Sequence, residues 1–453
     1  MHMQFLGATG TVTGSKYLVT ASRSKILIDC GLFQGFKQLR LRNWSHLPVA
    51  ASSIDAVVLT HAHLDHSGYI PVLVKNGFRG KIYCSEATYD LCRILLPDSG
   101  HLLEEEAGYA NRHAYSKHSP ALPLYTETEA EESLEYFSPV KFGKRFTVAG
   151  HLHAELARAG HILGASTVTL DVGKTTVVFS GDLGRTNDPI LAPPSQIDRA
   201  DYLVVESTYG NRRHDPADPM ELLGKTIQET VARGGVVIIP SFAVGRAQTL
   251  LYFMDRLKQS GAVSSVLPVY LNSPMAADVT ALYREYRKDH KLNDAQCRAM
   301  CNAAKFVNTV EESKALNLKH MPMVIIAASG MATGGRVLHH LKAFASDPRN
   351  TILFAGFQAG GTRGAAMLGG IDAIKIHGEY VPLRAQVVQI ENLSAHADAD
   401  EIMQWVSKFR QPPKQTFITH GEPDAADALR RRIEESLKWR CSVPDYLESV
   451  ELD

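Results

Sequence analysis

The sequence predicts an α/β fold, and two patterns along the chain support this prediction. Beyond Tyr209, apolar strands such as GGVVIIPS (234–241) and PMVIIAAS (322–329) alternate with amphipathic helical segments. This alternation is typical of a parallel sheet covered by helices. Before residue 209, short apolar strands joined by turns dominate, as in KILIDCG (25–31) and KTTVVFSGD (174–182). The two patterns indicate two structural parts.

The change of pattern also predicts where the parts meet. A chain of 453 residues is longer than a typical single domain. The strand and helix alternation begins near residue 209, and strands that look antiparallel return near residue 371. We therefore expect one domain formed by residues 1–208 and 371–453, with an inserted α/β domain at 209–370.

The composition is that of an ordinary globular protein and gives no sign of a membrane segment. The chain has 48 basic and 48 acidic side chains, and its six cysteines form no C-x-x-C pair. No apolar run approaches the roughly 18 residues that span a bilayer, and the first residues do not resemble a signal peptide. A cytoplasmic location and no membrane partner are expected. Because net charge is zero, a polyanionic substrate would have to be held locally, by metal ions and a few cationic side chains.

The stretch LTHAHLDHSG (59–68) carries three histidines and an aspartate directly after a buried apolar strand. Loops at such strand ends commonly hold active sites. Imidazole and carboxylate groups are ligands of zinc and similar divalent metals. A polar surface loop is the alternative, and it would be favoured if no further ligands existed elsewhere. The four candidates here are His61, His63, Asp65 and His66.

Three more residues at strand ends are suitable partners. His161 lies in ARAGHILGAS and Asp182 in VVFSGDLGR, both among small residues that allow close backbone approach. Asp29 ends the strand ILID and could orient a metal-binding histidine through a hydrogen bond. Each of these alone could be a capping aspartate or a hydrogen-bonded core histidine. Together with the histidine loop they predict a metal site.

These residues closely resemble the motifs of the metallo-β-lactamase superfamily. The resemblance implies an αββα sandwich that holds two zinc ions in one cleft. It further implies that His61, His63 and His161 hold one ion, that Asp65 and His66 hold the other, and that Asp182 bridges both. The superfamily includes several kinds of hydrolase, so these motifs do not identify a substrate.

Three later segments resemble motifs A, B and C of the β-CASP branch of RNA-processing nucleases, which cuts nucleic acids. They are VESTYGNR with Glu206, NLSAHAD with His396 and ITHGE with His420. The segments PSFAVGRAQ, NSPMA and AASGMATGGRVLHHL resemble the inserted β-CASP domain. The resemblance includes polyadenylation-factor endonucleases and short bacterial members. A histidine in motif C favours RNA over DNA, and His420 would complete the second metal site.

The resemblance implies a zinc-dependent ribonuclease that acts on single-stranded RNA and leaves 5′-phosphate and 3′-hydroxyl ends. His396 is the expected general acid, and Glu206 would orient it. Asp65 is expected to be a catalytic residue as well as a metal ligand. Endonucleolytic cutting is the first expectation, and 5′→3′ exonuclease activity remains open because it would use the same residues. The oligomeric state also remains open, and the sequence allows a homodimer.

Candidate phosphate contacts follow from a Gly-rich turn and two arginines. Ser329 and Gly330 end a predicted strand and could present backbone N–H groups to a phosphate. Arg246 and Arg363 could supply fixed positive charge. Ordinary salt bridges explain the two arginines equally well.

Two other functions remain as alternatives. The first is a hydrolase of DNA, of another phosphodiester or of a small ester, which His420 and the inserted domain disfavour. The second is a non-catalytic RNA-binding scaffold. The presence of every expected ligand disfavours the scaffold.

Overall fold

The computed structural model describes residues 1–113 and 116–453, which divide into two compact units. The first unit contains Met1–Arg213 and His396–Asp453, and the second contains His214–Ala395. The second unit therefore ends later than the insertion expected at 209–370. The reason is that strand β19 (Gln386–Ile390) pairs with β16 (Thr351–Ala355) in the sheet of the second unit. The strands expected near 371 form a hairpin, β17 (Ala373–Ile376) and β18 (Glu379–Pro382), that packs against the core of that unit.

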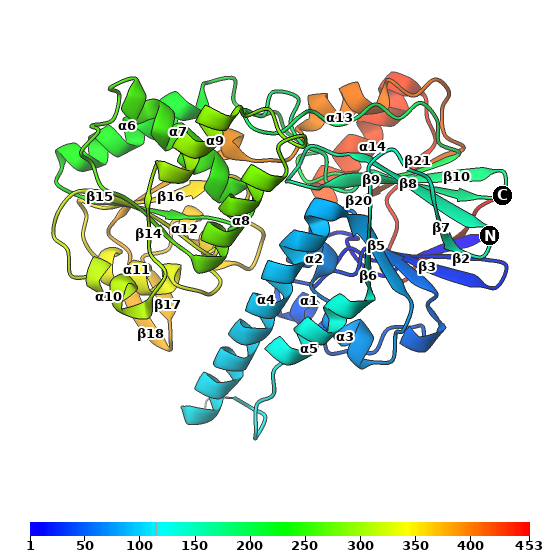
Figure 1. Cartoon of the computed structure of the whole chain (residues 1–453), viewed down its shortest axis with the longest axis horizontal. Coiled ribbons are helices and arrows are strands. Elements are labelled where there is room, and N and C mark those ends of the chain that lie inside the picture. Colours follow the sequence, from blue (N-terminus) through cyan, green and yellow to red (C-terminus); the bar gives the residue numbers. More distant parts are fainter. Residues whose placement is uncertain (114–115) are drawn as a thin grey trace. The chain divides into compact units, whose positions relative to one another are not determined.

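Two seven-stranded sheets form the centre of the first unit (Figure 1). The first sheet has, in spatial order, β22 (Ser449–Glu451), β1 (His2–Phe5), β2 (Tyr17–Ala21), β3 (Ser24–Ile28), β4 (Ala56–Val58), β5 (Lys81–Ser85) and β6 (Phe137–Val140). The second has β21 (Cys441–Ser442), β20 (Gln415–Thr419), β11 (Tyr202–Glu206), β10 (Thr175–Phe179), β9 (Ser166–Val172), β8 (Leu152–Arg158) and β7 (Phe146–Ala149).

Alternation of side chains along each strand produces the layers of this unit. Val177 and Phe179 of β10 belong to a buried apolar cluster that also includes Ile26 and Val58 of the first sheet. Val178, between them, belongs to a second cluster with Ile402 and other helical residues. Because successive side chains of a strand point to opposite faces, one face of β10 packs on the other sheet and one on helices. The expected αββα sandwich is confirmed.

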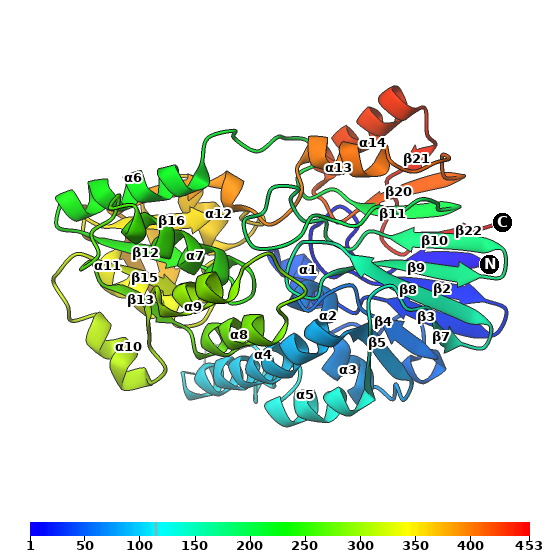
Figure 2. The ribbon, with the colours of Figure 1, turned by 45° about the horizontal axis from the view of Figure 1, so that its top comes forward.

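The helices of the first unit lie outside the two sheets, as both views in Figures 1 and 2 show. Near the first sheet are α1 (Lys37–Arg42), α2 (Leu64–Ser67), α3 (Ile70–Lys75), α4 (Glu86–Arg112) and α5 (Glu127–Ser133), and on the second sheet are α13 (Ala399–Val406) and α14 (Pro423–Leu437). In the part of the chain that the structure describes, 3-10 turns lie at Ala51–Ser53, Leu134–Tyr136 and Glu391–Leu393. No helix within residues 1–113 and 116–453 is long and apolar enough to cross a membrane.

The second unit is a parallel α/β layer, as the sequence predicts. Its main sheet has the order β14 (Lys305–Phe306), β13 (Val269–Asn272), β15 (Met323–Ala327), β12 (Val236–Pro240), β16 and β19, and each strand runs parallel to its neighbours. The helices of this unit are α6 (Pro219–Ala232), α7 (Arg246–Gln259), α8 (Pro274–Glu285), α9 (Asp294–Asn302), α10 (Val310–Leu316), α11 (Val337–Phe344) and α12 (Arg363–Leu368).

Within each of the two sheets of the first unit, strand direction brings polar residues from distant parts of the sequence to one edge. β3 and β4 run parallel, and so do β10, β11 and β20. Carboxyl ends of parallel neighbours meet at the same sheet edge. Chain continuing from these five ends carries Asp29, His61, Asp182, Glu206 and His420. The fold therefore gathers the sequence candidates at one end of the sandwich.

Candidate metal centre

Asp29 and His420 stand at sharp changes of chain direction just after their strands. Their φ angles are 58° and 50°, in the left-handed region that residues with a Cβ adopt uncommonly. Both positions are held by hydrogen bonds: the N–H of Asp29 donates to Val58 O at 3.0 Å, and that of His420 donates to Ala8 O at 2.7 Å. Such strained backbone persists where surrounding contacts fix it, which is common at functional sites.

The first group of candidate ligands consists of three imidazoles and one carboxylate. His63 Nδ1 lies 3.1 Å from His61 Nε2 and 3.2 Å from His161 Nε2. The Oδ2 atom of Asp182 lies 3.6 Å from the Nε2 atoms of both His61 and His161. Ligands placed about 2.0–2.1 Å from one zinc ion in a tetrahedral arrangement are separated from one another by roughly 3.3 Å. These residues therefore fit one tetrahedral metal ion.

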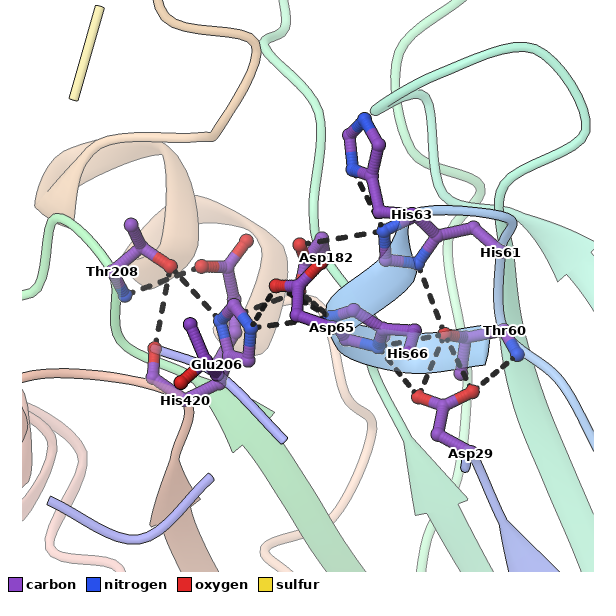
Figure 3. A network of polar contacts seen from close by, with 12 residues as sticks. Asp29, Thr60, His61, His63, Asp65, His66, Asp182, Glu206, Thr208 and His420 are labelled. Carbon is purple, nitrogen blue, oxygen red and sulfur yellow. Dashed lines mark hydrogen bonds and ion pairs between the residues drawn. The ribbon is translucent and has the colours of Figure 1, made fainter. Parts of the chain in front are cut away.

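The second group faces the other oxygen of the same carboxylate (Figure 3). His66 Nε2 lies 3.1 Å from His420 Nε2 and 3.3 Å from Asp182 Oδ1. The Oδ2 atom of Asp65 lies 3.4 Å from His420 Nε2 and 3.7 Å from His66 Nε2. These separations again match the edges of a metal coordination shell. Asp182 stands between both groups with one oxygen toward each, which is the geometry of a bridging ligand.

Hydrogen bonds determine which ring nitrogen each histidine presents. His66 Nδ1 donates to Asp29 Oδ2 at 2.7 Å. Thr60 donates its hydroxyl proton to Asp29, so its oxygen accepts from His61 Nδ1 at 3.1 Å. When the Nδ1 atoms carry the protons, the lone pairs of the Nε2 atoms point toward the candidate metal positions. Partners of this kind fix the tautomer and the ring orientation of metal ligands.

His420 is oriented in the same manner from another strand end. The hydroxyl of Thr208 donates to the carbonyl oxygen of His420 at 3.2 Å and lies 3.1 Å from its Nδ1. The hydroxyl oxygen can therefore accept the Nδ1 proton, which leaves Nε2 for a metal. Sequence reasoning missed both Thr60 and Thr208. Their closeness in sequence to candidate site residues could have identified them, because Thr60 directly precedes His61 and Thr208 lies two residues after Glu206.

Burial and neighbouring charges favour the protonation states that metal binding needs. Burial lowers the pKa of His61 and of His161 well below the usual range, and it lowers the pKa of His63 to about 4. These rings are therefore neutral. Burial alone would raise the pKa of Asp182, but His420 and other nearby imidazoles hold that pKa well below its usual value. Asp182 is ionised.

His66 is the exception, and its surroundings explain why. Burial lowers its pKa, but the carboxylates of Asp182, Asp29 and Asp65 raise it, and the net direction is well above the usual value. A ring among three carboxylates attracts positive charge. A divalent cation at Nε2 would meet the same demand.

His396 and Glu206 form a pair beside the first group. His396 Nδ1 donates to Glu206 Oε1 at 3.2 Å and lies 3.9 Å from Asp182 Oδ2. The carboxylate of Glu206 also accepts from the backbone N–H groups of Leu183, at 2.6 Å, and Thr208, at 3.2 Å. The pKa of His396 is lowered by burial, but Glu206 above all raises it, and the net shift is upward. Asp182, Glu206 and His396 are also close enough to form a third metal-binding group. Geometry alone therefore allows His396 to be either a general acid or a metal ligand.

The phosphate-contact candidates belong to the second unit, whereas all the residues above belong to the first. Ser329 Oγ accepts from the N–H of Thr333 at 3.1 Å and so closes its own turn. A Cβ added at Gly330 would lie 2.6 Å from the ring of Phe242, so close contact with that ring explains this glycine. These contacts describe the turn, and binding of a phosphate by its backbone N–H groups stays a prediction.

The two candidate arginines are also fixed within the second unit. Arg363 donates to the carbonyl oxygens of Lys375, Ala332 and Thr333 at 2.8–3.2 Å. Arg246 is 8% exposed at the start of α7. The guanidinium of Arg363 contacts the Gly-rich turn through the backbone carbonyls of Ala332 and Thr333, and a phosphate contact of either arginine stays a prediction.

Three protein-family models match the chain. The model described as "Metallo-beta-lactamase superfamily" matches residues 9–222, and the one described as "Beta-Casp domain" matches residues 247–367. A third, described as "Zn-dependent metallo-hydrolase RNA specificity domain", matches residues 380–444.

Two kinds of relative resemble the chain over most of its length. Ribonuclease TTHA0252 of Thermus thermophilus is 37% identical over 436 residues, which cover 94% of each chain. Transcription termination factor FttA of Methanosarcina mazei is 31% identical over 466 residues, covering 99% of this chain and 71% of the relative. FttA of Methanocaldococcus jannaschii is 30% identical, with 99% and 71% covered.

A solved structure resembles the whole chain in fold. It is a protein of unknown function from Enterococcus faecalis, with a TM-score of 0.53 and 13% sequence identity, and the match covers 100% of this chain and 99% of that one. At this identity the likeness concerns the fold alone.

Proposed function

Because the chain belongs to the β-CASP branch of the metallo-β-lactamase superfamily, we propose that it is a ribonuclease that hydrolyses RNA phosphodiester bonds with two zinc ions. The observation that supports this most directly is the position of Asp182. Its two oxygens face two separate groups of nitrogen and carboxylate ligands at 3.3–3.6 Å. A single carboxylate between two such groups is the arrangement that a dinuclear site requires.

In this proposal, His61, His63 and His161 hold one zinc ion, Asp65, His66 and His420 hold the other, and Asp182 contacts both. Two zinc ions bound there would supply Lewis acidity, which activates water and neutralises charge on a phosphodiester. The nitrogen and carboxylate donors suit zinc, which accepts four ligands of these types at about 2.0–2.2 Å. Asp29, Thr60 and Thr208 orient the ligands through the hydrogen bonds described above.

We propose that His396 is the general acid and that Glu206 orients it. With Nδ1 donating to Glu206, Nε2 is the atom that would deliver a proton to the 3′ oxygen as it leaves. The negative charge of Glu206 favours the protonated ring, which is the form that a general acid needs. Cleavage on this side of the phosphate leaves a 5′-phosphate and a 3′-hydroxyl.

The remaining parts of the proposal concern the substrate and the setting. We propose single-stranded RNA as the substrate, endonucleolytic cutting as the main mode, and the cytoplasm as the location. The relative named as a ribonuclease and the matched RNA specificity model support RNA. A homodimer is proposed as the assembly to be tested, by analytical ultracentrifugation.

The test is a comparison of three substrates with one preparation of the purified protein. Single-stranded RNA, single-stranded DNA of the same sequence and a chromogenic carboxylic ester are each incubated with enzyme containing a measured amount of zinc. RNA cleavage to 5′-phosphorylated products, lost on chelation and restored by zinc, is expected. Hydrolysis of only the ester, or RNA cleavage that persists in Asp182→Ala, would contradict the proposal.

A further inference from the structure

A surface around α1 combines exposed aromatic and basic side chains. Phe36, Leu41 and Trp44 are 49%, 55% and 59% exposed, which is unusual for large apolar side chains. Lys37 and Arg40 are exposed between them. No residue of α1 is buried, so packing into a core does not explain its sequence. We call these five residues the α1 surface.

The charge of this segment differs from that of the whole chain. Residues 30–54 contain Lys37, Arg40 and Arg42 and neither aspartate nor glutamate, although the whole chain has 48 basic and 48 acidic side chains. Within the described parts of the chain, Lys37 and Arg40 form no ion pair with an acidic side chain. Their charges are therefore available to an anionic partner.

The α1 surface is held in a fixed position. The guanidinium of Arg42 stacks on the ring of Tyr446 at 3.9 Å and lies 5.4 Å from the ring of Phe33. The buried side chain of Asn43 accepts from the N–H of Phe33 at 2.9 Å and donates to its carbonyl oxygen at 2.8 Å. These contacts fix the backbone on both sides of the α1 surface, and a segment that is already ordered loses less conformational entropy when it binds a partner.

The same segment leads directly to the metal centre. A Cβ added at Gly31 would lie 1.6 Å from the carbonyl oxygen of Asp65, so the backbone at Gly31 touches that of a candidate ligand. Phe36 follows five residues later, and five residues span at most roughly 18 Å. Both views in Figures 1 and 2 place α1 beside α2, the helix that contains Asp65 and His66.

We propose that the α1 surface binds single-stranded RNA next to the scissile bond, with Phe36 and Trp44 stacking on bases and with Lys37 and Arg40 contacting phosphates. This inference rests on the ribonuclease function proposed above. Aromatic platforms beside basic side chains are the recurring means of binding single strands without sequence preference. A six-residue helix with three nearby cations and no acid suits a polyanion better than an apolar protein partner.

The test compares long and short substrates. Lys37→Ala/Arg40→Ala and Phe36→Ala/Trp44→Ala are each assayed on a single-stranded 20-nucleotide RNA and on bis(p-nitrophenyl) phosphate, which has no nucleobase to stack and no second phosphate. Lys141→Ala/Lys144→Ala is the control, because both lysines are exposed and it changes the net charge equally. Zinc content and circular dichroism of every variant check the fold and the metal centre.

We expect both α1 variants to raise KM for the 20-nucleotide RNA while leaving kcat/KM for the small diester unchanged. Loss of two base stacks, each worth at least about 1 kcal/mol, raises KM at least about thirtyfold. Loss of two phosphate contacts lowers the slope of log KM against log salt by about 1.4, since each contact on a single strand contributes roughly 0.7. The ratio of the KM of Lys37→Ala/Arg40→Ala to the KM of the wild type then falls about sevenfold when the salt concentration rises from 50 to 200 mM.

Three results would overturn the inference, and they are distinguishable. If the protein cleaves RNA but the α1 variants match the lysine control in KM and salt slope, the α1 surface does not bind RNA and the ribonuclease proposal survives. Binding of another protein or of vesicles containing phosphatidylserine to that surface, with unchanged KM for RNA, would likewise refute RNA binding there. If the wild type hydrolyses the small diester but neither cleaves nor binds the RNA, both proposals fail.

Discussion

Replacing His396 by alanine should separate acid catalysis from metal binding. Nδ1 of His396 lies 3.2 Å from Glu206 Oε1 and 3.9 Å from Asp182 Oδ2, whereas His61 Nε2 and His161 Nε2 lie closer to Asp182 Oδ2, at 3.6 Å. Zinc content should therefore remain that of the wild type. A general acid contributes about 10²–10⁴-fold in rate, so kcat on RNA should fall by that factor.

The assay uses two leaving groups. RNA cleavage expels an alkoxide that needs a proton, whereas bis(p-nitrophenyl) phosphate expels a phenolate that needs little help. His396→Ala should lose activity on RNA but keep most of its activity on the nitrophenyl diester. Glu206→Gln, which keeps the size of the side chain and removes its charge, should show the same pattern more weakly, because the ring stays near its position.

The reasoning about His396 is refuted by either of two results. Equal losses on the two substrates would mean that proton transfer to the leaving group is not its role. A fall in zinc content of His396→Ala would instead identify the ring as a metal ligand, which the closeness of Asp182, Glu206 and His396 also allows. Zinc is measured by atomic emission on dialysed protein.

Three more outcomes follow from single contacts. Asp182→Ala removes one ligand from each group, so zinc content and RNA cleavage should be lost together, as metal analysis and gel assays would check. Asp29→Asn weakens the 2.7 Å contact with His66 Nδ1 and should reduce metal affinity about 10–100-fold, measured by competition with a chelator. Lys16 is fully buried, and burial lowers its pKa to about 8 from 10.5, so the unfolded chain binds more protons between these values. Relative to Lys16→Met, the free energy of unfolding of the wild type should rise by roughly 3 kcal/mol as pH increases across that window. Urea titrations of both proteins at pH 7 and 10 would measure this rise. An equal pH dependence of the two proteins would contradict the prediction.

Local pattern made much of the fold and site predictable. The apolar and polar periodicity of ADEIMQWVSKF predicts a helix, and α13 occupies Ala399–Val406. The apolar run before the histidine loop predicts a buried strand, and β4 is buried at all its positions. The second compact unit extends to Ala395, beyond the boundary expected at residue 370, and it includes the hairpin of β17 and β18, which packs on its core. The membership of this hairpin is decided by long-range contacts, which local pattern does not contain.

The sequence by itself determined the chemistry of the candidate site: the kinds of ligand, their order along the chain and the strands that they follow. Tertiary structure alone decided which atoms meet. Asp29 and His420 are separated by most of the chain and follow strands of two different sheets, and only the packing of those sheets brings both into contact with His66. The nitrogen that each histidine presents depends on Asp29, Thr60 and Thr208, because a hydrogen bond is directional and requires its partner at a defined place in space.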